Sequence, residues 1–102
     1  MSARLVFALA VALLGACRDK VTRGECARML ERYVELSAAQ DPTLVGLPPS
    51  QADEVRAERV AEKRASKEFA RAEEDCMRDV SRKELECAMA AKTPNDWEAC
   101  VE

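Results

Sequence analysis

Apolar residues recur at steps of three and four along most of the chain, which is the period of a helix that buries one face. Across residues 23–39 these positions are Cys26, Met29, Leu30, Tyr33, Val34 and Leu36. Across residues 51–79 a thinner stripe, ending just beyond the segment, comprises Ala57, Ala61, Ala65, Phe69, Ala72, Cys76 and Val80. Shorter apolar patterns predict helices over 82–91 and 94–101. No segment alternates apolar and polar residues as a half-buried strand would, so the sequence predicts an all-α fold.

A hydroxyl residue followed three positions later by an acidic residue is typical of a helix start, because each side chain can satisfy a free backbone N–H. The sequence has four such pairs: Thr22 with Glu25, Ser50 with Asp53, Ser81 with Glu84 and Thr93 with Asp96. Between the first two expected helices, the prolines and Gly46 of segment 41–49 interrupt helix. Its apolar residues are expected to pack back onto the helices: Leu44, Val45 and Leu47.

These segments predict a small bundle in which helices 23–39 and 51–79 form a long antiparallel hairpin, followed by two short C-terminal helices. The second helix is the longer, so the loop over 40–50 must cover the difference. Outside its apolar stripe this helix is mostly charged. We interpret the charges as a solvated surface; the alternative is an interaction surface.

The first residues have the pattern of a secretion signal. Arg4 precedes an unbroken apolar run over 5–14, which is ten residues long. Spanning a bilayer takes about 20 apolar residues, so the run is too short for a transmembrane helix. A charged start, a short apolar stretch and small residues after it indicate an exported precursor. The alternative is a buried helix of the mature domain.

The next four residues, Leu14-Gly15-Ala16-Cys17, resemble the lipobox of bacterial lipoprotein precursors. The resemblance implies that a diacylglycerol is attached to the Cys17 sulfur, that the chain is cleaved between Ala16 and Cys17, and that the new N-terminus is acylated. Two or more acyl chains anchor a protein stably, because each buried CH₂ contributes about 0.8 kcal/mol.

The residue after the lipobox cysteine is Arg18 and not Asp. Under the enterobacterial sorting rule that the resemblance implies, this favours the outer membrane over the inner one. The chain then divides into a signal peptide (1–16), a lipidated N-terminus with a short linker (17–22) and a helical domain (23–102).

The mature chain, residues 17–102, has 15 basic and 19 acidic side chains. This balance argues against nucleic acid as a partner, because phosphate binding needs a basic face. Its aromatic residues are few: Tyr33, Phe69 and Trp97. A domain with so few large apolar groups cannot readily offset its chain entropy by burial alone, so we expect disulfides to stabilise it.

Once Cys17 is lipidated, an even number of cysteines remains in the exported domain, which predicts two disulfides. In an antiparallel hairpin Cys26 should lie near Cys76, and Cys87 and Cys100 lie symmetrically about the turn at 93–94. We therefore favour Cys26–Cys76 with Cys87–Cys100. The pairing Cys76–Cys87 with Cys26–Cys100 remains open, since the first two also flank the turn at Ser81. Zinc binding and redox activity would need closely spaced cysteines, and the chain has no such pair and no His.

The sequence predicts neither an enzyme nor a bound cofactor or metal. Without His, the Ser-His and Cys-His nucleophile arrangements cannot form. The mature chain has two glycines, Gly24 and Gly46, so it has no Gly-rich loop to hold phosphates. The acidic residues alternate with Arg and Lys on helix faces, whereas paired-carboxylate catalysis needs a shielded cleft.

Cys76-x₁₀-Cys87-x₁₂-Cys100, with Cys87-Ala-Met-Ala-Ala-Lys-Thr before the last helix, resembles a set of small uncharacterised four-cysteine helical bacterial lipoproteins. The resemblance covers residues 26–100 and implies no activity. We therefore expect a non-enzymatic envelope lipoprotein, held to the membrane at Cys17, that is a structural element or binds an envelope protein. Its contact surface would be the Arg/Glu-rich second helix or an apolar groove near Tyr33 and Trp97.

Two alternatives remain. One is a lipoprotein that binds a small ligand or lipid in a pocket lined by Leu44, Val45, Leu47 and Phe69. The other is an inhibitor or immunity-type lipoprotein that blocks an envelope enzyme.

Overall fold

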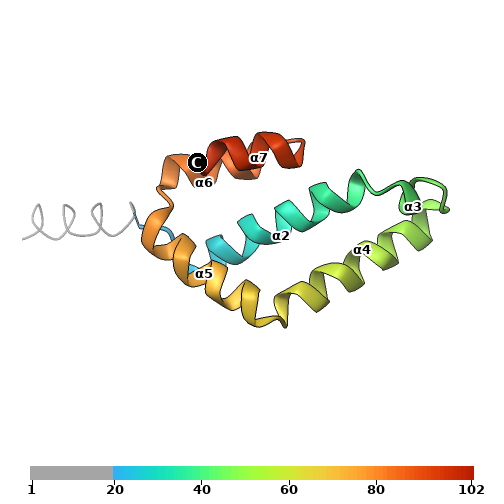
Figure 1. Ribbon diagram of the computed structural model, residues 1–102, viewed down its shortest axis with the longest axis horizontal. Helices are drawn as coiled ribbons and strands as arrows, with labels where there is room; N and C mark the ends of the chain where they lie inside the picture. The colour runs from blue at the N-terminus through green and yellow to red at the C-terminus, as the bar shows by residue number, and fades with distance from the viewer. Residues whose placement is uncertain (1–19) are drawn as a thin grey trace, which may run out of the picture.

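A computed structural model of the chain describes residues 20–102, and these residues form helices and no strand (Figure 1). The helices are α2 (Arg23–Ala39), α3 (Pro42–Val45), α4 (Pro49–Arg64), α5 (Lys67–Asp79), α6 (Arg82–Ala90) and α7 (Pro94–Cys100). The all-α prediction is confirmed. The segments for which we predicted a signal peptide, a cleavage site at Ala16 and Cys17, and lipidation of Cys17 lie outside the described residues.

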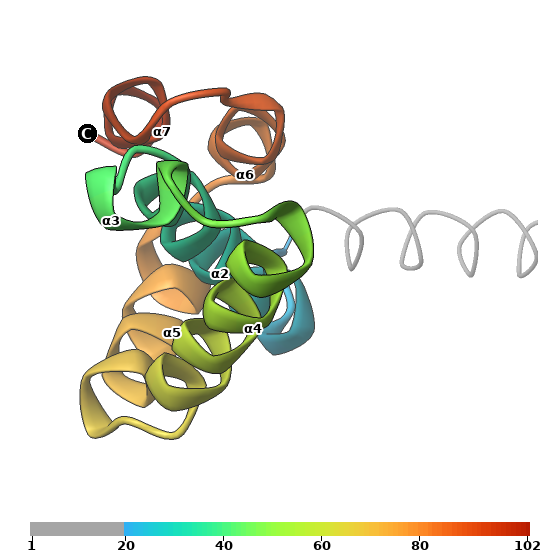
Figure 2. The ribbon, with the colours of Figure 1, turned by 90° about the vertical axis from the view of Figure 1, so that its right-hand side faces the viewer.

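The arrangement places α2 in the middle of the domain. On one side α2 packs against α4 and α5, which run back antiparallel to it, and on the other side against the hairpin of α6 and α7 (Figures 1 and 2). The short α3 lies at the turn between α2 and α4. The fold is therefore the expected antiparallel hairpin with two short C-terminal helices, and the hairpin also contains α3.

At three of the four predicted helix starts the hydroxyl accepts the expected hydrogen bond, and at two of them the acidic side chain also accepts from the cap N–H. Thr22 and Ser81 each form a full capping box. The Glu84 N–H donates to the Ser81 hydroxyl at 3.1 Å, and the Ser81 N–H donates to the Glu84 carboxylate at 3.0 Å. At the last helix the Asp96 N–H donates to the Thr93 hydroxyl at 3.1 Å. These local motifs set where α2, α6 and α7 begin.

The fourth predicted start, at Ser50, is wrong. Helix α4 begins at Pro49, and the preceding Pro48 provides no side-chain hydrogen bond. Proline suits the first helical position because its φ is already near the helical value and its missing N–H would have had no partner there. The helix therefore starts one residue after Pro48, and Ser50 lies inside its first turn.

The prediction of one helix over 51–79 is also wrong, because α4 ends at Arg64 and α5 begins at Lys67. Ser66 causes the break. Its hydroxyl donates to the Lys63 carbonyl at 2.6 Å and accepts from the Phe69 N–H at 3.2 Å, so it serves both as a stop and as a cap. Serine favours such local bonds over the interior of a helix.

The break divides the predicted apolar stripe. In α5, Phe69 and Cys76 are buried as expected. In α4 and the turn after it, Ala57, Ala61 and Ala65 are exposed. The narrow alanine face of α4 therefore does not pack closely against the rest of the domain.

The core lies where α2, α5, α6 and α7 meet, and its buried members are Val21, Cys26, Met29, Leu36, Cys76, Leu85, Ala88, Ala91 and Trp97. The indole N–H of Trp97 donates to the Met29 carbonyl at 3.0 Å, so the largest core side chain has its polar atom satisfied. Val21 belongs to the expected linker over 17–22, yet it is buried. The packed part of the chain therefore begins before α2.

Two disulfides hold the helices together. Cys26–Cys76 joins the start of α2 to the end of α5, with Cα atoms 5.9 Å apart. Cys87–Cys100 joins α6 to α7, with Cα atoms 5.6 Å apart. The favoured pairing is confirmed and the alternative pairing is wrong, because antiparallel packing brings Cys26 to Cys76.

Candidate functional site

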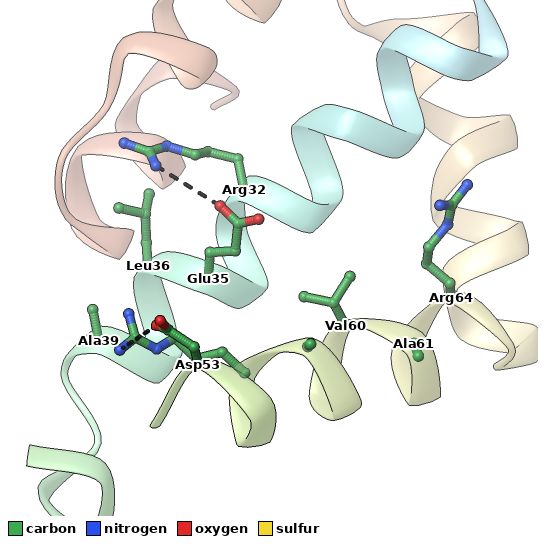
Figure 3. A pocket seen from close by; sticks show the side chains of 10 residues that line it. Arg32, Glu35, Leu36, Ala39, Asp53, Val60, Ala61 and Arg64 are labelled. Atoms are coloured by element: carbon green, nitrogen blue, oxygen red, sulfur yellow. Dashed lines mark ion pairs between the residues drawn. The ribbon is translucent and has the colours of Figure 1, made fainter. Parts of the chain in front are cut away.

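A cleft of about 650 Å³ opens between α2 and α4 (Figure 3). Figure 1 shows that α4 and α5 meet at an angle at the break between them. The α2–α4 cleft is lined from α2 by Arg32, Glu35, Leu36 and Ala39, and from α4 by Asp53, Arg56, Ala57, Val60, Ala61 and Arg64.

The base of the α2–α4 cleft is apolar, and two of the residues that line it from α4 have small side chains. Leu36 is buried and Val60 is half-buried, whereas Ala57 and Ala61 are exposed. Larger residues at the two alanine positions would fill the space next to α2. The sequence pattern predicted that Ala57 and Ala61 are packed against the domain, but in the structure they line an open cleft.

The rim of the α2–α4 cleft is charged, and its ion pairs are exposed to solvent. An Arg32 guanidinium nitrogen lies 3.9 Å from a Glu35 carboxylate oxygen, and the corresponding Arg56–Asp53 distance is 3.3 Å. Asp53 is 74% exposed. Such surface pairs contribute only about 0–1 kcal/mol each, so a carboxylate on a bound molecule could replace Glu35 or Asp53.

Arg64 joins the two helices that form the cleft, and Arg32 joins α2 to the C-terminal hairpin. Arg64 pairs across the helices with Glu31 of α2 at 2.9 Å. Arg32 donates to the carbonyl of Ala91, in the turn between α6 and α7, at 3.0 Å. Its Nε is buried and has no acceptor among the described residues. The Arg32 side chain is therefore held at the junction of α2, the C-terminal hairpin and the cleft.

The residues that we expected to line a ligand pocket are only partly brought together. Leu44, Val45 and Leu47 line a groove of about 290 Å³ beside α3. Phe69 is not among its residues, because it lies on α5, beyond the break. Leu44 is buried, as predicted. Val45 is 75% exposed, so the prediction that it packs against the helices is wrong.

The expected groove near Tyr33 and Trp97 is instead a packed contact. The two rings lie 4.7 Å apart between centroids, and Trp97 is buried. The Tyr33 hydroxyl donates to Glu98 at 2.7 Å, and this bond is the main cause of the raised pKa of Tyr33. Tyr33 also borders a second cleft of about 490 Å³ with Asp41 and Arg59.

Two carboxylates have strongly lowered pKa values, and both hold helix ends. The pKa of Glu25 is about 2, mainly because of its hydrogen bond with Arg82, with the Thr22 N–H next. The pKa of Asp41 is about 2, mainly because Thr43 donates to it, with Arg59 adding to the effect at 2.7 Å. Both carboxyl groups are therefore ionised at neutral pH, and their hydrogen bonds stabilise the starts of α2 and α3.

Within residues 20–102, no cluster of three His, Cys, Asp or Glu is placed to bind a metal ion. None of the described helices has both the length and the apolar character needed to span a membrane. Comparison with models of protein families, with curated proteins and with solved structures finds no match to this chain.

Proposed function

We propose that this chain is the precursor of a non-enzymatic lipoprotein, anchored through Cys17 in the bacterial outer membrane, whose helical domain binds another envelope protein. The observation that carries the proposal is the use of the cysteines. Four of them pair as Cys26–Cys76 and Cys87–Cys100. The fifth, Cys17, stands in the lipobox-like sequence after a secretion signal.

The two disulfides and the secretion signal point to the same compartment. Structural disulfides persist in oxidising compartments such as the bacterial periplasm. A secretion signal delivers the chain to that side of the membrane. A fifth cysteine there would be an odd, reactive thiol, and lipidation removes it while providing the anchor.

The α2–α4 cleft is the contact surface that we propose for the partner. Its apolar base is flanked by guanidinium groups, and protein interfaces are enriched in arginine around an apolar centre. Arg32 and Arg56 each pair with an exposed carboxylate of their own helix, at 3.9 and 3.3 Å. A partner segment with small apolar side chains and a carboxylate would fit both the base and the rim.

Intact mass spectrometry of the membrane-extracted protein tests the anchor. We expect the mass of residues 17–102 with three acyl chains and a glyceryl thioether, and no free thiol before reduction. The Cys17→Ser variant should leave the membrane fraction. An unprocessed 102-residue chain with free thiols would refute the proposed anchor.

A cleft-blocking variant tests the contact surface. Ala61→Trp places a large ring in the α2–α4 cleft, whereas Glu58→Trp adds the same ring at an exposed α4 position that does not line it. After cross-linking in intact cells, we expect the first variant to lose its cross-linked envelope protein and the second to keep it. Equal cross-linking by both variants would exclude the cleft as the contact surface.

The volume of the same cleft favours a second candidate function, a lipoprotein that binds a small molecule. About 650 Å³ lies within the range of roughly 300–1,000 Å³ that is usual for ligand pockets. Native mass spectrometry of protein extracted from membranes would then show an added mass that Ala61→Trp removes. Protein that carries no added mass would rule this candidate out.

A further inference from the structure

The folded domain begins very close to the proposed lipid attachment point. Val21 is buried in the core with 6% exposure, and Thr22 already caps α2. Only three residues separate Val21 from Cys17. At no more than about 3.6 Å per residue, four steps of extended chain reach about 14 Å. A domain tethered so closely has little freedom to move away from the bilayer surface.

Three chain segments meet at this end of the domain: the start of α2, the end of α5 and the start of α6 (Figure 1). The Cys26–Cys76 disulfide joins the first two. Arg82 joins the third to the first, because its guanidinium binds Glu25 at 2.8 and 2.9 Å and donates to the Lys20 carbonyl at 3.2 Å. This anchor-side end, residues 20–25 and 76–85, is therefore held together by a disulfide and by the contacts of Arg82.

We propose that the anchor-side end rests on the phospholipid headgroups, with the ammonium groups of Lys20 and Lys83 against lipid phosphate. The inference rests on the proposed lipidation of Cys17 and adds which face of the domain meets the membrane. Phosphate is the anionic group that a membrane surface offers to lysine side chains.

The carboxylates at this end are already engaged, which leaves the two ammonium groups to interact with lipid. Glu25 binds Arg82, Glu84 accepts from the Ser81 N–H, and Arg78 pairs with Asp75 at 2.8 Å and Asp79 at 3.2 Å. Lys20 and Lys83 are both exposed, and neither forms an ion pair with a described residue.

This orientation leaves the proposed partner surface accessible. The α3 turn lies at the end of the domain opposite the anchor-side end, and the α2–α4 cleft lies between them (Figure 1). Lys92, in the turn after α6, is at the other end of that helix from Lys83. Lys20 and Lys83 should therefore contact the membrane, whereas Lys92 should not.

Lysine acylation can measure the orientation without any substitution in the domain. The lipidated protein is reconstituted into vesicles of phosphatidylethanolamine and phosphatidylglycerol and treated with a membrane-impermeant amine reagent. Mass spectrometry then gives the acylation rates of Lys20, Lys63, Lys67, Lys83 and Lys92. Rates are divided by that of Lys92, which corrects for protein facing the vesicle lumen. The matched control is the Cys17→Ser protein mixed with the same vesicles.

We expect Lys20 and Lys83 to react several-fold more slowly in the lipidated protein than in the control, and Lys63 and Lys67 to react equally in both. If the lipidated protein floats with the vesicles but its relative rates equal those of the control, the orientation is wrong while the anchor stands. If the mature protein carries no lipid and does not float, the proposed anchor itself fails.

Discussion

Trp97 connects the C-terminal hairpin to α2 through both its ring and its indole N–H, which donates to the Met29 carbonyl. We predict that Trp97→Ala lowers the free energy of unfolding by about 3–5 kcal/mol, as large aromatic truncations in a core do. Trp97→Phe keeps most of the ring and loses the hydrogen bond, so it should cost about 1–3 kcal/mol. Urea unfolding of the Cys17→Ser domain, followed by circular dichroism, measures both.

The control for this pair is Val45→Ala, since Val45 is 75% exposed and should change the free energy of unfolding by less than about 0.5 kcal/mol. Equal losses for Val45→Ala and Trp97→Ala would contradict the assignment of Trp97 to the core.

Glu25 gives the domain a pH dependence whose sign follows from its pKa. The carboxyl group has a pKa of about 2 in the fold, below its usual value of 4.5, chiefly because Arg82 holds it ionised. The stabilisation is therefore fully present above about pH 4.5 and is lost as the pH falls towards 2. We predict that the melting temperature falls over this interval.

Glu25→Gln should lower the melting temperature at pH 7 and reduce its fall between pH 4.5 and 2, because the titrating group is gone. Asp41, whose pKa is also about 2, should retain its own contribution in that variant. An acid-induced fall that is the same in the variant and the parent would show that Glu25 does not contribute it.

At the level of helices, Ser66 is the cap that separates α5 from α4. Replacing an N-cap serine with alanine typically costs about 1 kcal/mol, and we predict this loss for Ser66→Ala in urea unfolding. Ser50→Ala is the matched control. Ser50 lies inside the first turn of α4 and is not its cap, so its replacement should change stability little. A larger loss for Ser50→Ala than for Ser66→Ala would reverse the two assignments.

Most of the helix pattern could be predicted because it depends on local chemistry. The bonds of Thr22, Ser81 and Thr93 close within three residues, so their spacing is visible in the sequence. Ser66 was missed because Phe69 stands where an acidic partner would complete the motif. Without that partner, the apolar stripe on both sides of Ser66 favoured one continuous helix.

At the level of the whole molecule, the disulfide pairing could be predicted and the α2–α4 cleft could not. Antiparallel packing alone brings Cys26 to Cys76. The cleft is lined by α4, and the sequence pattern did not predict that α4 ends at Arg64 and that a separate helix begins at Lys67. The sequence pattern assigned Ala57 and Ala61 to the packed stripe, whereas in the structure both are exposed and line the cleft.

The two disulfides should differ in how fast they are reduced, because a thiolate must reach a sulfur atom to break the bond. Cys26 is 0% exposed and Cys76 is 3% exposed, whereas Cys87 is exposed. We predict that dithiothreitol reduces Cys87–Cys100 first in the folded domain. Timed alkylation followed by peptide mass spectrometry identifies which pair is modified.

The partly reduced protein should remain folded, since Cys26–Cys76 still joins α2 to α5. From loop lengths, the disulfides contribute about 4 kcal/mol for Cys26–Cys76 and about 3 kcal/mol for Cys87–Cys100. The Cys87→Ala/Cys100→Ala double variant should therefore lose less stability than Cys26→Ala/Cys76→Ala. If Cys26 and Cys76 were alkylated before the other pair, the domain would have to open at α2 before it opens at α7. The core around Met29 would then not be the most stable part of the molecule.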